Sequence, residues 1–148
     1  MNEFKPFEDK LAGLIAALSP TSRRHMTVEI AKKLRQRQQQ RIKSQKSPDG
    51  TPYAPRKRQP IKAKKGRIKR EMFAKLRTNR FLKASGDTNE AVVEFTSKVQ
   101  RIARVHHYGL KDKPGRNSAA VEYPERKLLG FNNGDTKLIE DEIIRMLS

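Results

Sequence analysis

A proline-rich turn at residues 47–55 divides the chain into a helical part before it and a mixed α/β part after it. Pro48 fixes its own φ and lacks an N–H, and Gly50 can adopt a positive φ. A helix arriving from the N-terminal side therefore cannot continue, and a tight turn follows. Pro52 and Pro55 keep the residues around Tyr53 extended. We expect Tyr53 to anchor this loop to the body of the protein or to another subunit.

The helix that ends at this turn is predicted to be long and basic. Ser19 supplies an N-cap and Pro20 a proline at the first helical position, and the helix is predicted to extend to Lys46. Apolar residues recur every four positions in its first half (Met26, Ile30, Leu34), whereas residues 35–41 read RQRQQQR. At about 1.5 Å per residue the helix would be on the order of 40 Å long, which is more than a small domain can cover. We expect its second half to protrude into solvent or to lie against a charged partner.

The remaining patterns predict the order ααα-ββ-α-β-α. They are an apolar, buried helix around residues 4–18, a short helix at 72–78, a hairpin of strands 81–85 and 91–96, a helix from Ser97 that turns Ile102 inward and closes at Gly109, a loop at 111–118, an edge strand at 119–123, and a C-terminal helix capped by Asp135. The fold class is α+β, with a helical N-terminal half, a long protruding basic helix, a small antiparallel sheet flanked by helices, and a C-terminal helix. We expect a single domain over 1–148, with a protruding basic arm at about 35–70.

Charge is the most pronounced property of the composition. The 148 residues carry a net charge of +18. Residues 23–70 hold 18 Lys and Arg against two acids, whereas residues 122–148 hold four bases against six acids. Such asymmetry favours either a polyanionic partner or head-to-tail pairing between copies.

Several classes of protein are disfavoured by what the sequence lacks. There is no cysteine, which excludes disulfides and thiolate metal sites. No apolar run approaches the roughly 20 residues that span a bilayer, and the first ten residues lack the order of a signal peptide. We therefore expect a protein made and used in a cytoplasm, with no membrane contact.

The sequence offers no recognisable catalytic or metal site. His106 and His107 are adjacent, so on a helix their side chains point about 100° apart and would need a third ligand from elsewhere to hold a metal. No nucleophile elbow, Walker loop or HExxH motif is present. Asp141 and Glu142 are interpreted as ordinary solvated charges of the C-terminal helix. We expect no enzyme activity, no metal and no cofactor.

Three stretches, in the same order and at similar spacing, resemble the phage virion morphogenesis family, the tail completion proteins of contractile-tailed phages. They are the basic helix running into Arg41, Gln45, Pro48-Asp49-Gly50, Tyr53 and Pro55; the stretch Ala103 to Gly109, ARVHHYG; and Tyr123 to Phe131, YPERKLLGF, followed by an acidic terminal helix. Together they cover residues 22–147. The sequence departs from the family at Tyr53, where a tryptophan is expected as often.

The resemblance implies a structural protein that acts in tail completion or head–tail joining. It implies a homo-oligomeric ring, six-fold by family analogy, at the head-proximal end of the tail. The implied partners are the tail tube and the neck or connector proteins. The implied location is the virion, in the tail or neck, with the host cytoplasm as the place of assembly.

Candidate subunit or partner contacts lie within the family-like stretches: Tyr53, Arg104, His106, Tyr108, Tyr123, Arg126 and Leu129. Arg and Tyr are enriched at interface centres, which favours an interface role for Arg104 and Arg126. Core packing is the favoured interpretation for His106 and Leu129.

The basic run at 56–70 supplies candidate contacts to a polyanion or an acidic partner: Arg56, Lys57, Arg58, Lys62, Lys64, Lys65, Arg67, Lys69 and Arg70. Bases at this density can neutralise phosphates, so a non-specific nucleic-acid-binding protein that uses residues 23–70 is the alternative function. Stacking on single strands is disfavoured, because Tyr53 is the one Phe, Tyr or Trp in that range. A basic face complementary to an acidic neighbour in an assembly explains the same charges.

Overall fold

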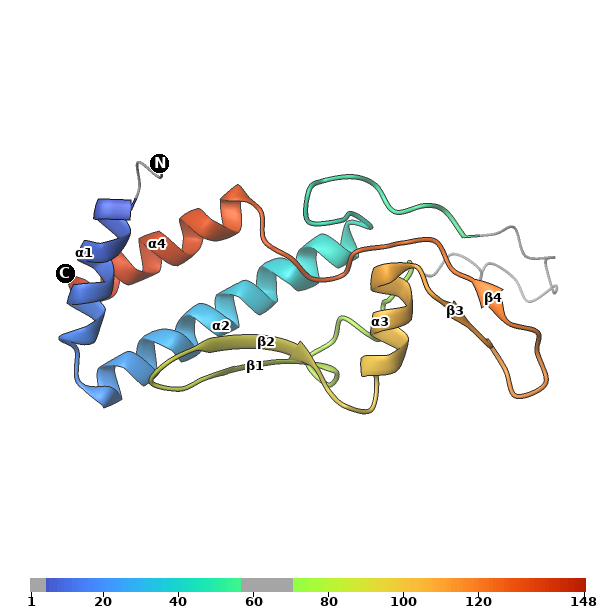
Figure 1. Cartoon of the computed structure of the whole chain (residues 1–148), viewed down its shortest axis with the longest axis horizontal. Coiled ribbons are helices and arrows are strands. Elements are labelled where there is room, and N and C mark those ends of the chain that lie inside the picture. The colour runs from blue at the N-terminus through green and yellow to red at the C-terminus, as the bar shows by residue number, and fades with distance from the viewer. Residues whose placement is uncertain (1–4, 57–70) are drawn as a thin grey trace.

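The computed structural model describes residues 5–56 and 71–148, and it confirms the α+β class. Figure 1 shows a long central helix with a hairpin along one side and the C-terminal helix along another. The elements are α1 (Lys5–Ala16), α2 (Pro20–Lys43), β1 (Leu82–Gly86), β2 (Ala91–Phe95), α3 (Gln100–Tyr108), β3 (Lys111–Asp112), β4 (Val121–Glu122) and α4 (Asn133–Leu147).

Both ends of α2 follow the local sequence. The Ser19 side chain accepts a hydrogen bond from Ser22 N, and Pro20 begins the helix. The helix ends at Lys43, three residues before the predicted end, and Gln45 has a positive φ of 58°. The predicted turn follows: Gly50 has φ 88° and its N–H donates to the Ser47 carbonyl oxygen.

The second half of α2 does not protrude, so that prediction is wrong for the part of the arm that the structure describes. Leu34, Gln38 and Ile42 are 6%, 4% and 0% exposed. The helix runs through the middle of the molecule, against the β1–β2 hairpin and α4 (Figure 1). One side of the polar stretch is covered, because Arg37, Gln38 and Arg41 have polar partners on the C-terminal segment, as described below. The remainder of the predicted arm, 57–70, lies outside the described residues.

The β1–β2 hairpin was predicted closely. Its strands pair antiparallel, with Leu82 opposite Phe95, and the Asp87 side chain accepts hydrogen bonds from two backbone N–H groups in the turn. The sheet lies directly on α2, because a Cβ on Gly86 would be 2.6 Å from Thr27 Oγ1. Thr27 Oγ1 also donates to the Asp87 carbonyl oxygen at 2.7 Å.

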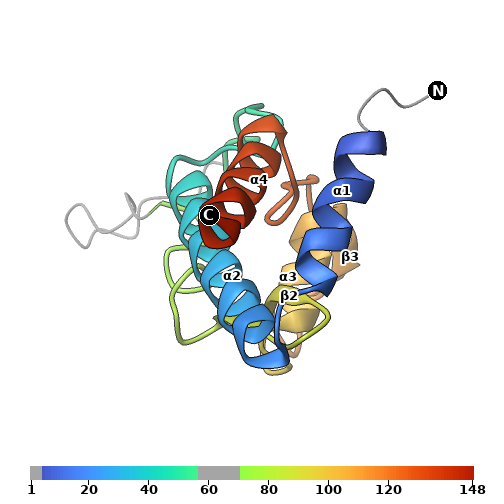
Figure 2. The same ribbon diagram turned by 90° about the vertical axis from the view of Figure 1, so that its left-hand side faces the viewer.

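Apolar side chains form two clusters along α2. One lies at the C-terminal end of the helix and contains Ile42, Tyr53, Leu76, Leu82, Phe95, Val99, Ala103 and Leu128. The other is built on Met26, Ile30 and Leu34, with partly buried residues of α1, β2 and α4 packed against it. Figure 2 shows α1, the start of α2 and the end of α4 gathered at this second end of the molecule.

Four local predictions are wrong. Residues 72–78 form turns rather than a helix, because both backbone groups of Met72 bond to the Gln45 side chain. Lys111 and Asp112 are a strand rather than loop, paired with the predicted edge strand at Val121–Glu122. Leu14 of α1 is 44% exposed instead of buried, and Ile102 of α3 is 52% exposed instead of turned inward. Gly109 ends α3 with φ 66°, as predicted.

Candidate assembly surface

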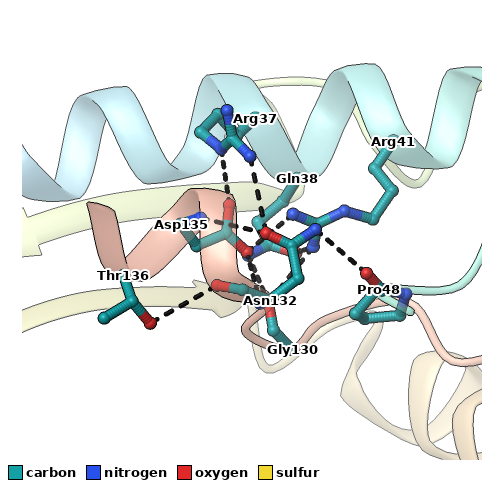
Figure 3. Close-up of polar contacts among 8 residues, drawn as sticks. All are labelled: Arg37, Gln38, Arg41, Pro48, Gly130, Asn132, Asp135 and Thr136. Carbon is teal, nitrogen blue, oxygen red and sulfur yellow. Dashed lines mark hydrogen bonds and ion pairs between the residues drawn. The ribbon is translucent and has the colours of Figure 1, made fainter. Parts of the chain in front are cut away.

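A buried carboxylate joins the long helix to the C-terminal helix. Asp135 is 0% exposed and accepts hydrogen bonds from Arg37 Nε at 2.5 Å and Arg41 Nη2 at 2.6 Å (Figure 3). Arg37 and Arg41 share one face of α2, since residues four apart lie one above the other on a helix. Asp135 also accepts from Asn132 N at 3.1 Å, and the Asn132 side chain accepts from Asp135 N at 2.9 Å. This reciprocal pair is a capping box, in which Asn132 is the N-cap of α4. The prediction that Asp135 is the N-cap is therefore wrong.

The same group of side chains fixes the loop before α4. The Gly130 carbonyl oxygen accepts from Gln38 Nε2 at 2.8 Å and from Arg41 Nη1 at 3.2 Å. Asn132 Nδ2 donates to the Pro48 carbonyl oxygen at 3.0 Å (Figure 3). We call this set the Asp135 junction: Arg37, Gln38, Arg41, Pro48, Gly130, Asn132 and Asp135. It ties α2, the turn after it and the start of α4 into one unit.

Hydrogen bonds from basic side chains lower the pKa of two acids on α4, Asp135 and Glu142. Burial by itself raises the pKa of Asp135, but the hydrogen bonds from Arg37 and Arg41 outweigh burial and hold that pKa below its ordinary value of 3.8. Glu142 lies about two turns further along the same side of α4. It is 8% exposed and pairs with Lys33 and Arg145. The hydrogen bonds from Arg145 and Lys33 lower the pKa of Glu142. Glu142 is therefore not the solvated charge that the sequence suggested.

A second set of contacts fixes the segment from residue 123 to 129 against the loop after α2. Arg126 is 5% exposed, and its guanidinium donates to the Ala54 carbonyl oxygen at 2.8 Å and the Pro55 carbonyl oxygen at 3.2 Å. Tyr53 is 7% exposed and donates its hydroxyl hydrogen to the Lys127 carbonyl oxygen at 2.9 Å. Burial raises the pKa of Tyr53 to about 12. The structure places both side chains inside the body of the subunit.

The histidine pair, at the C-terminal end of α3, packs against this segment. The His106 ring lies edge-on between Phe73 and Tyr123, with centroids 5.1 and 4.8 Å away. His107 Nδ1 accepts from Leu128 N at 3.1 Å. Burial lowers the pKa of both imidazoles, and the nearby Arg126 and Lys127 lower the pKa of His106 and His107 respectively. Within residues 5–56 and 71–148, no three His, Cys, Asp or Glu side chains gather to hold a metal.

A shallow groove runs between β2 and α3. It has a volume of about 380 Å³, and we call it the β2–α3 groove; its lining is Val93, Glu94, Phe95, Gln100, Ala103, Arg104, His107, Tyr108 and Leu129. Three predicted contact residues meet there, namely Arg104, Tyr108 and Leu129. Tyr108 is 61% exposed, whereas Leu129 is partly buried.

The other predicted contact residues lie elsewhere. His106, Tyr123 and Arg126 line a separate hollow of about 1010 Å³ together with Arg56. Arg56 is exposed, and the other eight basic candidates of 57–70 lie outside the described residues.

Reasoning from the sequence missed the Asp135 junction and Phe131. Phe131 is 70% exposed, more than any other large apolar side chain in the described part of the chain. The Asn132-x-x-Asp135 spacing was a readable capping-box signal. Nothing in the sequence, however, shows that Gln38 and Asp135 are buried, because their partners are more than 90 residues away along the chain.

Comparisons with known proteins decide the family. The model of the phage virion morphogenesis family matches residues 2–148. The chain belongs to this family. It is 50% identical to tail completion protein S of Escherichia phage P2 over 148 residues, which covers 99% of each chain. No solved structure matches. The resemblance read from three short stretches is thus confirmed over the full length of this family member.

The helices can also be compared with the requirements of a membrane span. None of the helices in the described ranges of this family member is both long enough and apolar enough to cross a bilayer.

Proposed function

We propose that this chain is a structural protein of a bacteriophage that completes the tail and joins it to the head. The full-length similarity to tail completion protein S carries this proposal. In it, copies of the chain form a ring, six-fold by family analogy, at the head-proximal end of the tail. The ring contacts the tail tube and the neck or connector proteins, and it forms in the host cytoplasm before it becomes part of the virion.

The structure supports an assembly role through its exposed apolar features. Phe131 and Tyr108 are 70% and 61% exposed and lie on elements held firmly by buried contacts. Rigid, exposed aromatic side chains are typical of interface centres, because little conformational entropy is lost when a partner covers them. The Asp135 junction also suits a structural role. Charge-assisted hydrogen bonds join α2 to α4, and the Asn132 side chain joins the start of α4 to the turn after α2.

Complementation tests the proposed function directly. The gene for this chain is supplied in trans to an Escherichia phage P2 mutant that lacks tail completion protein S, and the titre and the particles are examined. We expect plaque formation to be restored. Where host range limits plaques, we expect electron microscopy to show heads joined to tails. The proposal would be contradicted if heads and tails remained unjoined although the lysate contained every other structural protein and the folded product of this gene.

Ring formation is tested by measuring the native mass of the nuclease-treated protein at moderate salt. The stoichiometry is measured for the free protein and for the protein bound to purified tails that lack it. We expect a closed oligomer of one stoichiometry in at least one of these two states. A monomer in both states would contradict ring formation while leaving a tail-completion role to the complementation result.

A contact between the basic segment and DNA is a second proposal, favoured by the nine bases without an acid at residues 56–70. Changing these bases to Gln should abolish DNA retention if they bind DNA. If they bind an acidic protein neighbour instead, the same variant should keep its mass as an oligomer yet fail to join heads and tails. Arg37 and Arg41 contribute little to either contact, because Asp135 already engages them.

A further inference from the structure

Phe131 is exposed in a fixed position rather than on a loose loop. The residue before it, Gly130, has its carbonyl oxygen held by two side chains of α2, and the residue after it, Asn132, is held by the capping box and by Pro48. A Cβ on Gly130 would be 2.8 Å from Pro48 Cγ, so the loop also packs closely on the turn after α2. An aromatic side chain that is 70% exposed between two immobilised neighbours is prepared for a partner.

The β2–α3 groove has the complementary character. Its lining includes the apolar residues Val93, Phe95, Ala103 and Leu129, together with the exposed aromatic ring of Tyr108. A volume of about 380 Å³ accommodates one aromatic side chain and the backbone beside it.

The edge of β2 that faces away from β1 also borders the groove, and no other strand of the described part of the chain pairs with it. Thr96 N donates to the Phe81 carbonyl oxygen, which puts that pair in the hydrogen-bonded register of the hairpin. Ala84 and Val93 are three positions further along the ladder and therefore form a non-hydrogen-bonded pair. The backbone N–H and C=O of Val93 consequently point away from β1, and such an edge favours an added partner.

Each of the two surfaces carries one exposed acid and one exposed base. Lys46 and Asp49 are exposed and line the same hollow as Phe131, which has a volume of about 620 Å³. Glu94 and Arg104 are exposed and line the β2–α3 groove. None of these four side chains is in an ion pair within residues 5–56 and 71–148. One acid and one base on each surface allow two pairs, Lys46 with Glu94 and Asp49 with Arg104.

We propose that Phe131 of one copy of this chain inserts into the β2–α3 groove of the next copy. The inference rests on the proposed ring and names its subunit contact. The two hollows share no lining residue, so a subunit can offer Phe131 to one neighbour and its groove to another. Such a contact between different patches is heterologous, and it closes into a ring when the rotation between copies permits.

Single substitutions test the two surfaces separately. Phe131→Ala should weaken self-association by about 30-fold or more, as expected for a buried aromatic anchor. Glu94→Lys should weaken it as well, and Lys46→Glu should restore association when combined with Glu94→Lys. Ile144→Ala is the matched control, because Ile144 is an exposed apolar side chain at 45% and lines neither surface.

Mixing variants tests the direction of the contact. Phe131→Ala keeps its groove, and Glu94→Lys keeps its Phe131, so an equimolar mixture should give 1:1 heterodimers that do not grow further. Each variant alone should stay monomeric, with a circular dichroism spectrum and a melting temperature like those of the wild type.

The outcomes separate this inference from the proposed function. A wild-type oligomer that Phe131→Ala leaves unchanged overturns the contact and leaves the ring intact. An unchanged oligomer that no longer binds tails overturns it too, because the occupant of the contact is then another tail protein. A wild type that is monomeric both alone and on tails overturns the ring and the contact together.

Discussion

Replacing Asp135 by Asn should destabilise the fold more than any surface change on the same helix. The substitution keeps the shape of the side chain and removes its charge. Arg41 then loses its ion-pair partner while its side chain is only 10% exposed. Removing one member of a buried pair costs about 3–5 kcal/mol, because the remaining charge stays desolvated.

The other contacts of Asp135 change the estimate little. The Arg37 side chain is 38% exposed, so water replaces most of its lost pairing, and this term is about 0–1 kcal/mol. An Asn side chain can still accept from Asn132 N, which preserves the capping box. We expect a total loss of about 3–6 kcal/mol in the free energy of unfolding, or about 10–20 °C in melting temperature for a chain of this size.

Urea unfolding followed by circular dichroism measures this loss. Asp141→Asn is the control, because Asp141 is an exposed acid of the same helix and should change stability by less than about 0.5 kcal/mol. In a cycle with Arg41→Gln, the second substitution should cost much less than the first. A loss for Asp135→Asn no larger than that of Asp141→Asn would refute the argument that the junction is a buried ionic connection.

The pH dependence of the free energy of unfolding also tests the buried ion pair of Asp135. The pKa of Asp135 is lower in the folded state than its ordinary value of 3.8, so the unfolded chain binds its proton first as the pH falls. The stabilisation is complete above pH 3.8 and is lost as the pH falls through the folded pKa. The gap between the wild type and Asp135→Asn should therefore be constant near neutral pH and close only below that value.

Two further predictions concern α3 and the segment that packs on it. Gly109→Ala should lower the free energy of unfolding by about 2 kcal/mol or more. Gly109 has φ 66°, and the new Cβ would be 2.8 Å from Glu125 N. Gly13→Ala is the control in the same melting assay and should be neutral or slightly stabilising, because no atom lies within 4 Å of its new Cβ. Acidification below the ordinary histidine pKa of 6.5 should lower the urea midpoint, since burial lowers the pKa of His106 and His107 and the unfolded chain takes up protons first. His107→Asn should reduce this slope, because an amide oxygen can accept from Leu128 N without titrating; an unchanged slope would contradict the role given to that imidazole.

Local signals in the sequence were sufficient for much of the fold. Ser19 and Pro20 marked the start of α2, and the cluster of Pro48 and Gly50 marked its end, because capping and proline effects act within a few residues. The hairpin and the glycine that ends α3 were found for the same reason. These features depend on the backbone preferences of the residues that form them.

Burial of polar residues could not be predicted in the same way. Residues 35–41 lack any apolar side chain, and a polar face usually means solvent. Gln38 is nevertheless 4% exposed, because the Gly130 carbonyl oxygen satisfies its amide. Tyr53 was expected to anchor its loop to the body of the protein or to another subunit, and Arg126 was expected at an interface. Both side chains bond to backbone carbonyl oxygens more than 70 residues away in the same chain, and local sequence patterns do not reveal such contacts.

The position of Phe131 gives the Asp135 junction a reason beyond stability. Replacing a buried ion pair by apolar residues is often neutral or stabilising, so stability alone does not explain two arginines on one buried carboxylate. An apolar contact would let the loop before α4 slide, whereas hydrogen bonds of fixed direction hold Gly130 and Asn132 in one register. If subunits meet through Phe131, that register sets the angle between neighbours, and a small error in angle prevents a ring from closing. In the proposed ring the junction would set the angle between subunits as well as the stability of each subunit. Asp135→Asn releases Arg41, which also donates to the Gly130 carbonyl oxygen. We therefore expect this variant to impair closure of the proposed ring even at temperatures where the subunit remains folded.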